Sequence, residues 1–234
     1  PPFRDPFNYF FDPLVPLSVE MVGAAMHARL VAAGLGGSVM RSAANYSTWY
    51  NGGLRTITYF HNMIGILTEI AGSPNPIEIP LVPARQLPSG DQPLPLPPQT
   101  WRYRQAVDYS ISNNRAILDF ASRYRETLLF NIWRMGMNSI EKGSRDNWTV
   151  TPRRIAELQK AAKSDPAAGS KPVPPSLYDT VLHNPARRDP RGYILPADQP
   201  DFATTVAFVN ALLKTGVAVS RATADFEVAG KRYP

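Results

Sequence analysis

Hydrophobic residues recur at helical spacing in the first part of the chain. The apolar positions of this stretch are Val19, Val22, Met26, Leu30 and Ala33. Steps of three and four residues place them on one face and predict a helix, which we expect the glycines at 34, 36 and 37 to end. His27 lies off that face, and we interpret it as a solvated helix residue.

The longest helical pattern runs from about residue 105 to residue 142. Its apolar positions are Val107, Ile111, Leu118, Ala121, Leu128, Ile132 and Met135. The steps are of three or four residues, with one gap of seven, and most charged residues lie off this stripe. The pattern predicts one bent helix or two helices, with Gly136 as a weak point near the end.

Between these helices, residues 39–72 are predicted to be extended. The run from Thr56 to Ile70 is almost continuously apolar, β-branched or aromatic, which is typical of a central strand in a sheet covered on both sides. Alternation along such a strand places Gly65 and Glu69 on the same face. Gly65 would then leave room for a ligand to approach beside Glu69.

Proline divides the rest of the chain. Nine of the 24 prolines fall within 74–98, which we expect to be a long extended loop, and nine more fall within 151–200. We interpret 159–190 as a linker between a first domain, residues 1–158, and the start of a second. In the second, 191–234, the pattern predicts strands at 192–196 and 217–219 around a helix at 202–214, and then the first arm of a hairpin. We expect this α/β unit to be truncated.

Composition narrows the choice of function. The chain has 234 residues, 44% of them hydrophobic, which indicates a globular protein with a real core, and it has no cysteines, which excludes disulfides and thiolate metal sites. We see no apolar stretch approaching the roughly 18 residues of a membrane span. The net charge of +6 comes from arginines interspersed with acids. This favours an arginine-rich helix surface over a nucleic-acid interface.

The strongest catalytic candidate is Glu69, a carboxylate among aliphatic residues. Such a group needs a cation, hydrogen-bond donors or a raised pKa, although many carboxylates at strand ends are simply solvated or salt-bridged. The three histidines are far apart in sequence, and none begins a His-x-x-Glu or His-x-x-x-His motif. We therefore expect this chain alone to hold no complete metal site.

Two segments resemble zinc carboxypeptidases, most closely the large bacterial type. They are Asn51-Gly52-Gly53-Leu54-Arg55-Thr56 and the run from Tyr59 to Glu69, supported by the aromatic Pro-Pro-Phe-Arg-Asp-Pro loop at the start and by Asn138-Ser139-Ile140-Glu141. The resemblance covers most of 1–158 and, less closely, 191–234. It implies an α/β fold, a three-layer α/β/α sandwich around a mixed sheet, of which this chain would hold part.

The resemblance also implies an activity, the removal of C-terminal residues from peptides. Glu69 would be the general base toward a water activated by zinc and then the proton donor to the leaving amine. Arg55, Tyr59, His61 and Asn62 would line the substrate pocket, and Arg55 would pair with the terminal carboxylate.

The zinc ligands of the family are absent from this chain. We expect them in an upstream part of the same polypeptide, so these residues alone would be inactive. The resemblance further implies a secreted or periplasmic protein. From the charge distribution and the apolar stretches we expect no nucleic acid as partner and no membrane span. The alternative is a non-catalytic module of the same fold that binds a peptide or glycan.

Overall fold

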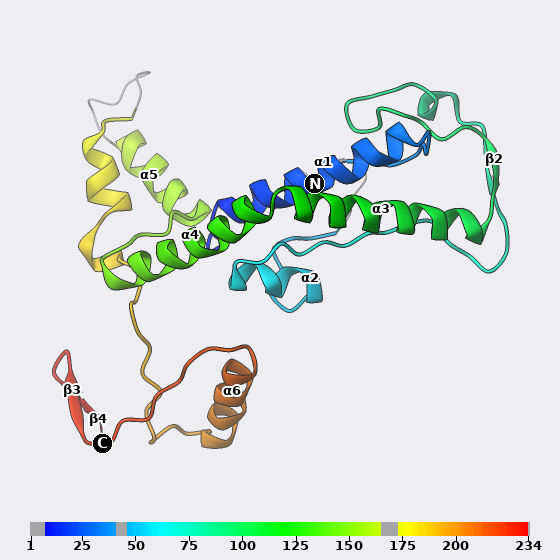
Figure 1. The fold of residues 1–234 in the computed structure, drawn as a ribbon. Helices are drawn as coiled ribbons and strands as arrows, with labels where there is room; N and C mark the ends of the chain where they lie inside the picture. Colours follow the sequence, from blue (N-terminus) through cyan, green and yellow to red (C-terminus); the bar gives the residue numbers. More distant parts are fainter. Residues whose placement is uncertain (1–7, 41–45, 165–172, 234) are drawn as a thin grey trace. The chain divides into compact units, whose positions relative to one another are not determined.

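The computed structural model describes residues 8–40, 46–164 and 173–233. The chain divides into two compact units, Pro1–Asp189 and Pro190–Pro234. Within the described residues the fold mixes helices with two small antiparallel sheets, so a mixed α/β composition is confirmed (Figure 1).

Helix α1 (Leu14–Ala32) confirms the first predicted helix. It begins where the Asp12 carboxylate accepts the Leu14 N–H at 2.9 Å. It ends in a Schellman turn: Gly34 has a φ of +69° and the Leu35 N–H donates to the Leu30 carbonyl at 2.9 Å. The chain therefore reverses at Gly34 and returns along the helix.

Helix α1 also corrects our statement that no apolar stretch of the sequence approaches the length of a membrane span. Its 19 residues are long and apolar enough to cross a membrane, by length and composition alone. A signal sequence and the core helix of a globular protein meet the same criterion. Seven of its residues are buried within the first unit, namely Val15, Ser18, Val19, Val22, Gly23, Met26 and Leu30.

The second helical pattern forms two helices, α3 (Tyr103–Arg123) and α4 (Arg125–Ser144). They are interrupted at Tyr124 rather than at Gly136. Helix α3 packs along α1 (Figure 1), and its buried residues are Ala106, Tyr109, Asn113, Ala116 and Phe120.

The predicted buried face of α3 was therefore wrong. Ile111 and Leu118 are 43% and 70% exposed. The packed face instead carries Ala106 and Ala116, whose small side chains let two helices approach closely. Both faces, the predicted one and the observed one, have residues at helical spacing. Choosing the more hydrophobic face therefore led to the wrong prediction.

The predicted central strand at 56–70 was also wrong. Helix α2 (Leu54–Ile57) and the 3-10 turn η2 (Thr58–His61) occupy its first half. Threonine hydroxyls bond to nearby backbone carbonyls here, Thr56 to Tyr50 and Thr58 to Arg55, and such local bonds compete with a strand ladder. Residues 63–72 follow without forming a strand in the described part of the chain.

The proline-rich loop is anchored by a small sheet at its ends. Strands β1 (Ile77–Ile79) and β2 (Gln99–Trp101) pair antiparallel, with Ile77 opposite Trp101. Between them lies the short turn η3 (Pro83–Arg85). Ile77, Ile79 and Trp101 pack with Leu30 and Tyr109 into one apolar cluster.

We expected residues 159–190 to be a linker, but the first unit extends through residues 159–189. They include the end of helix α5 (Pro152–Ser164), the π-helical turn η4 (Tyr178–Leu182) and the 3-10 turn η5 (Pro185–Arg187). The Asp189 carboxylate accepts bonds from Asn147 Nδ2 at 2.8 Å and from the Thr149 N–H at 2.7 Å. These bonds tie the end of the segment to the chain before α5.

The second unit contains α6 (Phe202–Lys214), which confirms the predicted helix. Strands β3 (Phe226–Val228) and β4 (Lys231–Tyr233) then form a complete hairpin. Ala229 and Gly230 join them with φ values of +52° and +77°, as in a type I′ turn. The predicted βαβ unit was wrong, because residues 192–196 and 217–219 form no strand in this unit.

Candidate functional site

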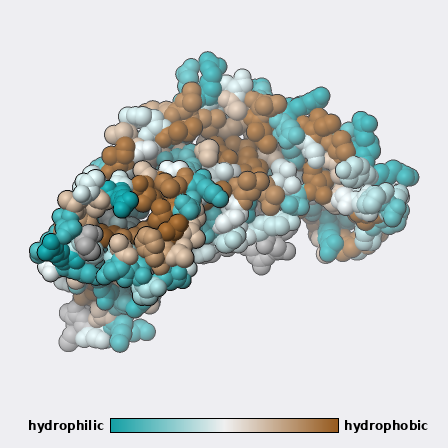
Figure 2. All heavy atoms as spheres, turned by 90° about the horizontal axis from the view of Figure 1, so that it is seen from below, coloured by the Kyte–Doolittle hydropathy of each residue, from teal (hydrophilic) through white to brown (hydrophobic). Residues whose placement is uncertain are grey.

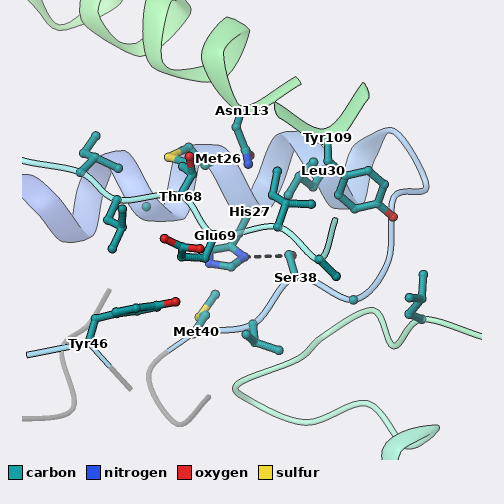
Figure 3. A pocket seen from close by; sticks show the side chains of 18 of the residues that line it. Met26, His27, Leu30, Ser38, Met40, Tyr46, Thr68, Glu69, Tyr109 and Asn113 are labelled. Atoms are coloured by element: carbon teal, nitrogen blue, oxygen red, sulfur yellow. Dashed lines mark hydrogen bonds between the residues drawn. The ribbon is translucent and has the colours of Figure 1, made fainter. Parts of the chain in front are cut away.

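A cleft of about 340 Å³ opens in the first unit beside α1 (Figure 3). One wall is α1 itself, and a second is the returning chain 36–40. Residues 65–71 form a third wall, and α3 contributes Tyr109 and Asn113. The Schellman turn at Gly34 brings the first two walls together, so the cleft follows directly from the way α1 ends.

Glu69 lines this cleft from the extended segment 65–71. Its neighbours Ile66 and Ile70 pack against separate apolar clusters of the core. The side chain of Glu69 is exposed within the cleft opening (Figure 3). The carboxylate is therefore held beside apolar walls but remains in contact with solvent.

His27 also lines the cleft, although we expected it to be solvated. It is half-buried, and its Nδ1 lies 2.9 Å from Ser38 Oγ. Burial lowers the pKa of the imidazole, which favours its neutral form at neutral pH. The one sequence feature that indicates this pair is the glycine turn that brings residue 38 back along α1.

Tyr59 lines the cleft but belongs mainly to the core. It is 1% exposed, and its hydroxyl donates to the Gly65 carbonyl at 3.0 Å. Burial raises the pKa of the phenol, and the nearby Arg55 guanidinium acts in the opposite direction. Its hydroxyl thus fixes the start of the segment that carries Glu69.

Arg55, the second residue of α2, lines the cleft as well. Its Nη2 donates to the Ser47 carbonyl at 2.6 Å. The structure therefore brings together three of the five candidates from the sequence: Glu69, Arg55 and Tyr59.

His61 and Asn62 do not line the cleft. His61 is exposed at the last position of η2. Asn62 ends that turn in the left-handed conformation, with a φ of +57°, and the Met63 N–H donates to the Thr58 carbonyl behind it at 3.1 Å. Asparagine tolerates this conformation well, so its role here is to end the turn.

Position 65 requires a glycine for a packing reason that the sequence did not reveal. A Cβ at this position would collide with the Arg55 carbonyl and the Thr58 hydroxyl. The space beside Gly65 is therefore filled by α2 and η2 and is not open to a ligand, contrary to our expectation.

The inner part of the cleft contains polar groups that we did not single out from the sequence. Trp101 Nε1 donates to the Ala71 carbonyl at 2.7 Å, and the Tyr109 hydroxyl donates to the Gly36 carbonyl at 2.8 Å. Asn113 Oδ1 is buried and has no hydrogen-bond partner. Asn113 could have been identified from its position in a series of residues spaced by three and four along α3, namely 106, 109, 113, 116 and 120.

The described residues contain no group of three or more histidine, cysteine or acidic side chains that could hold a metal ion. Glu69 and His27 are the ionisable oxygen and nitrogen donors that line the cleft together, and two donors do not make a structural or catalytic zinc site. These residues therefore do not fit zinc by themselves.

Comparison with known proteins adds no relative. No family model matches the chain, and neither a curated protein nor a solved structure is similar to it.

Proposed function

We propose that this chain is the part of a zinc-dependent carboxypeptidase that carries the general base, Glu69. The observation that supports this most directly is the position of Glu69 on the wall of the cleft, beside apolar residues and within reach of solvent. A general base must reach both water and substrate, and this position allows both.

In this proposal Glu69 accepts a proton from the attacking water and transfers it to the nitrogen of the leaving residue. The water oxygen bonds to the scissile carbonyl carbon as the C–N bond breaks. Arg55, on the same cleft, pairs with the terminal carboxylate of the peptide. Zinc would add Lewis-acid chemistry, and the proposal places its ligands in an upstream part of the same polypeptide.

The proposal includes a three-layer α/β/α sandwich for the complete domain. Residues 63–72 support this because they are extended yet form no strand within the described chain. A segment of this kind, which forms no ladder with the described strands, is suited to join strands from elsewhere in the protein. The proposal also places the protein in the periplasm or outside the cell, following the family it resembles.

The test is Glu69→Gln in the full-length protein supplied with zinc. We expect kcat to fall by a factor of at least about 100, because the amide cannot accept the proton. The exposed carboxylate Glu227, in the second unit, provides the matched control, and Glu227→Gln is expected to leave kcat unchanged. Undiminished peptide hydrolysis by Glu69→Gln would exclude Glu69 as the base.

A second candidate is a module that binds a peptide or glycan without cleaving it. It is favoured by the mainly aliphatic and aromatic lining of the cleft. This function predicts that the protein binds such ligands in the presence of a chelator and that they remain intact after long incubation with zinc.

A further inference from the structure

Asn113 is the one polar residue among the buried positions of α3. It is 7% exposed, and its Oδ1 has no hydrogen-bond partner. Along the helix it lies between Tyr109 and Ala116, which belong to two separate apolar clusters. Asn113 therefore lies between the two clusters along α3, and it lines the cleft.

The neighbouring polar groups do not satisfy this oxygen. Trp101 and Tyr109 each donate to a backbone carbonyl, of Ala71 and Gly36 respectively. Figure 3 shows the Asn113 side chain pointing from α3 toward the side of the cleft formed by Met26 and Leu30. Both of those side chains are apolar and buried.

An unsatisfied buried acceptor destabilises a folded protein, typically by about 1–3 kcal/mol. Native proteins keep few such groups, and those that persist usually have a partner that is supplied by something else. Here the acceptor borders a cleft whose volume, about 340 Å³, is in the range of small-molecule sites. Because Asn113 lines this cleft, a ligand bound there lies against the residue whose acceptor is unpaired.

We propose that the inner end of this cleft binds an apolar ring that carries one N–H or O–H donor. The ring packs against the cleft lining that Met26 and Leu30 of α1 form with the aromatic side chains Trp101 and Tyr109. Its donor bonds to Asn113 Oδ1. Because none of these five side chains is charged, the site favours a neutral group such as a phenol or an indole over an ion.

This inference goes beyond the proposed peptidase activity and does not depend on it. Binding is measured on the chain without zinc and without peptide. A failure to bind the ring would therefore not bear on Glu69 as the general base. In the same way, evidence against Glu69 as the base would not bear on this binding site.

The experiment compares p-cresol with toluene by NMR titration of the full chain. The two molecules share a methyl-substituted ring and differ in the hydroxyl. We expect p-cresol to bind about 5- to 10-fold more tightly, the value of one net hydrogen bond to a buried neutral group. Toluene is the more hydrophobic of the two, so a preference for p-cresol cannot come from hydrophobicity.

Asn113→Leu keeps a side chain of similar size and removes the acceptor. We expect it to bind toluene at least as well as the native chain and to lose the preference for p-cresol. The control is Asn114→Leu, at the exposed neighbouring position, which should keep the preference. If Asn113→Leu does not fold, the two ligands still test the proposal on the native chain.

Three results would overturn the proposal. One is equal binding of p-cresol and toluene by the native chain. Another is an undiminished preference for p-cresol in folded Asn113→Leu. The third is the absence of shifts for residues of the cleft at ligand concentrations up to the solubility limit.

Discussion

At Gly65 the extended segment passes directly against the carbonyl of Arg55. The Tyr59 hydroxyl bonds to the carbonyl of the same glycine, so two contacts fix this one residue. Four residues later the segment reaches Glu69 on the cleft wall. The position of the proposed base therefore depends on a close backbone approach that any Cβ would prevent.

Gly65→Ala tests this dependence. We expect it to lower the free energy of unfolding by about 1–3 kcal/mol, because the added methyl group meets backbone atoms that cannot rotate away. Gly90→Ala is the matched control: its Cβ would meet nothing within 4 Å, and its φ is not positive. That change should be neutral or slightly stabilising. Urea denaturation of both variants gives the comparison, and equal stabilities would contradict the packing at Gly65.

At the scale of an element, α3 shows how a helix can be predicted while its packed face is not. Phe120 is 6% exposed and packs against Val22 and Met26 of α1. Leu118, which the sequence pattern placed in the core, is on the exposed side. The two residues are two positions apart, so they point in clearly different directions from the helix.

A pair of truncations distinguishes the two faces. Phe120→Ala should lower the free energy of unfolding by about 3–5 kcal/mol, because it leaves a cavity in the core. Leu118→Ala should change it by less than about 0.5 kcal/mol, as is usual at exposed sites. Thermal or urea unfolding of the two variants measures both changes. If Leu118→Ala were the more destabilising of the two, the buried face of α3 would be the one that carries Ile111 and Leu118.

The sequence predicted elements with strong local signals. Helix α1 has a regular apolar face and a glycine stop, and α6 was predicted with the bounds that the structure shows. The run from Thr56 to Ile70 misled because its β-branched residues are also compatible with short turns that threonine hydroxyls stabilise. Its final fold depends on contacts distant in sequence, which composition does not encode.

The same reasoning explains which site residues could be found. Glu69 was identified because a carboxylate in an apolar run is unusual wherever the run folds. His27 and Asn113 were not, since a histidine or an asparagine on a helix is common. Their importance arises only when the turn at Gly34 and the packing of α3 on α1 create the cleft between them.

Helix α6 begins with a cap that depends on pH. The Asp201 carboxylate accepts the Thr204 N–H at 3.0 Å and the Thr204 hydroxyl at 2.6 Å. These two bonds lower the pKa of Asp201. The contribution of the cap is thus fully present above the carboxyl's unfolded pKa of about 3.9 and is lost as the pH falls through the lower, folded value.

We expect the Thr204 amide resonance to titrate at a pH below that of an ordinary aspartate, together with loss of helical shifts in the first turn of α6. NMR of the full chain follows both. Asp201→Asn supplies the control, because asparagine also caps helices but does not ionise in this range. Its first turn should be insensitive to acid. A Thr204 amide that titrates in the same way in Asp201→Asn would show that another group is responsible.

At the scale of the whole molecule, large apolar side chains remain exposed in both units. Figure 2 shows hydrophobic residues on the face that it draws. In the first unit, Trp133 and Phe130 of α4 are 56% and 57% exposed. In the second, the described residues include no buried side chain at all. The two units therefore differ in how far each can stabilise its own backbone.

Hydrogen exchange measures this difference directly. Helix α1 has seven buried residues, whereas α6 has none, and Phe202 and Phe208 are 54% and 52% exposed. A helix of 13 residues that lacks tertiary packing is only marginally stable in water. Its amides therefore open locally at low free-energy cost, whereas those around Val22 and Met26 of α1 open only with the core. We expect protection factors in α6 at least roughly 100-fold below those of α1 in the same sample. Comparable protection in the two helices would mean that the apolar face of α6 is covered in solution, and that the second unit is not stabilised by its own contacts alone.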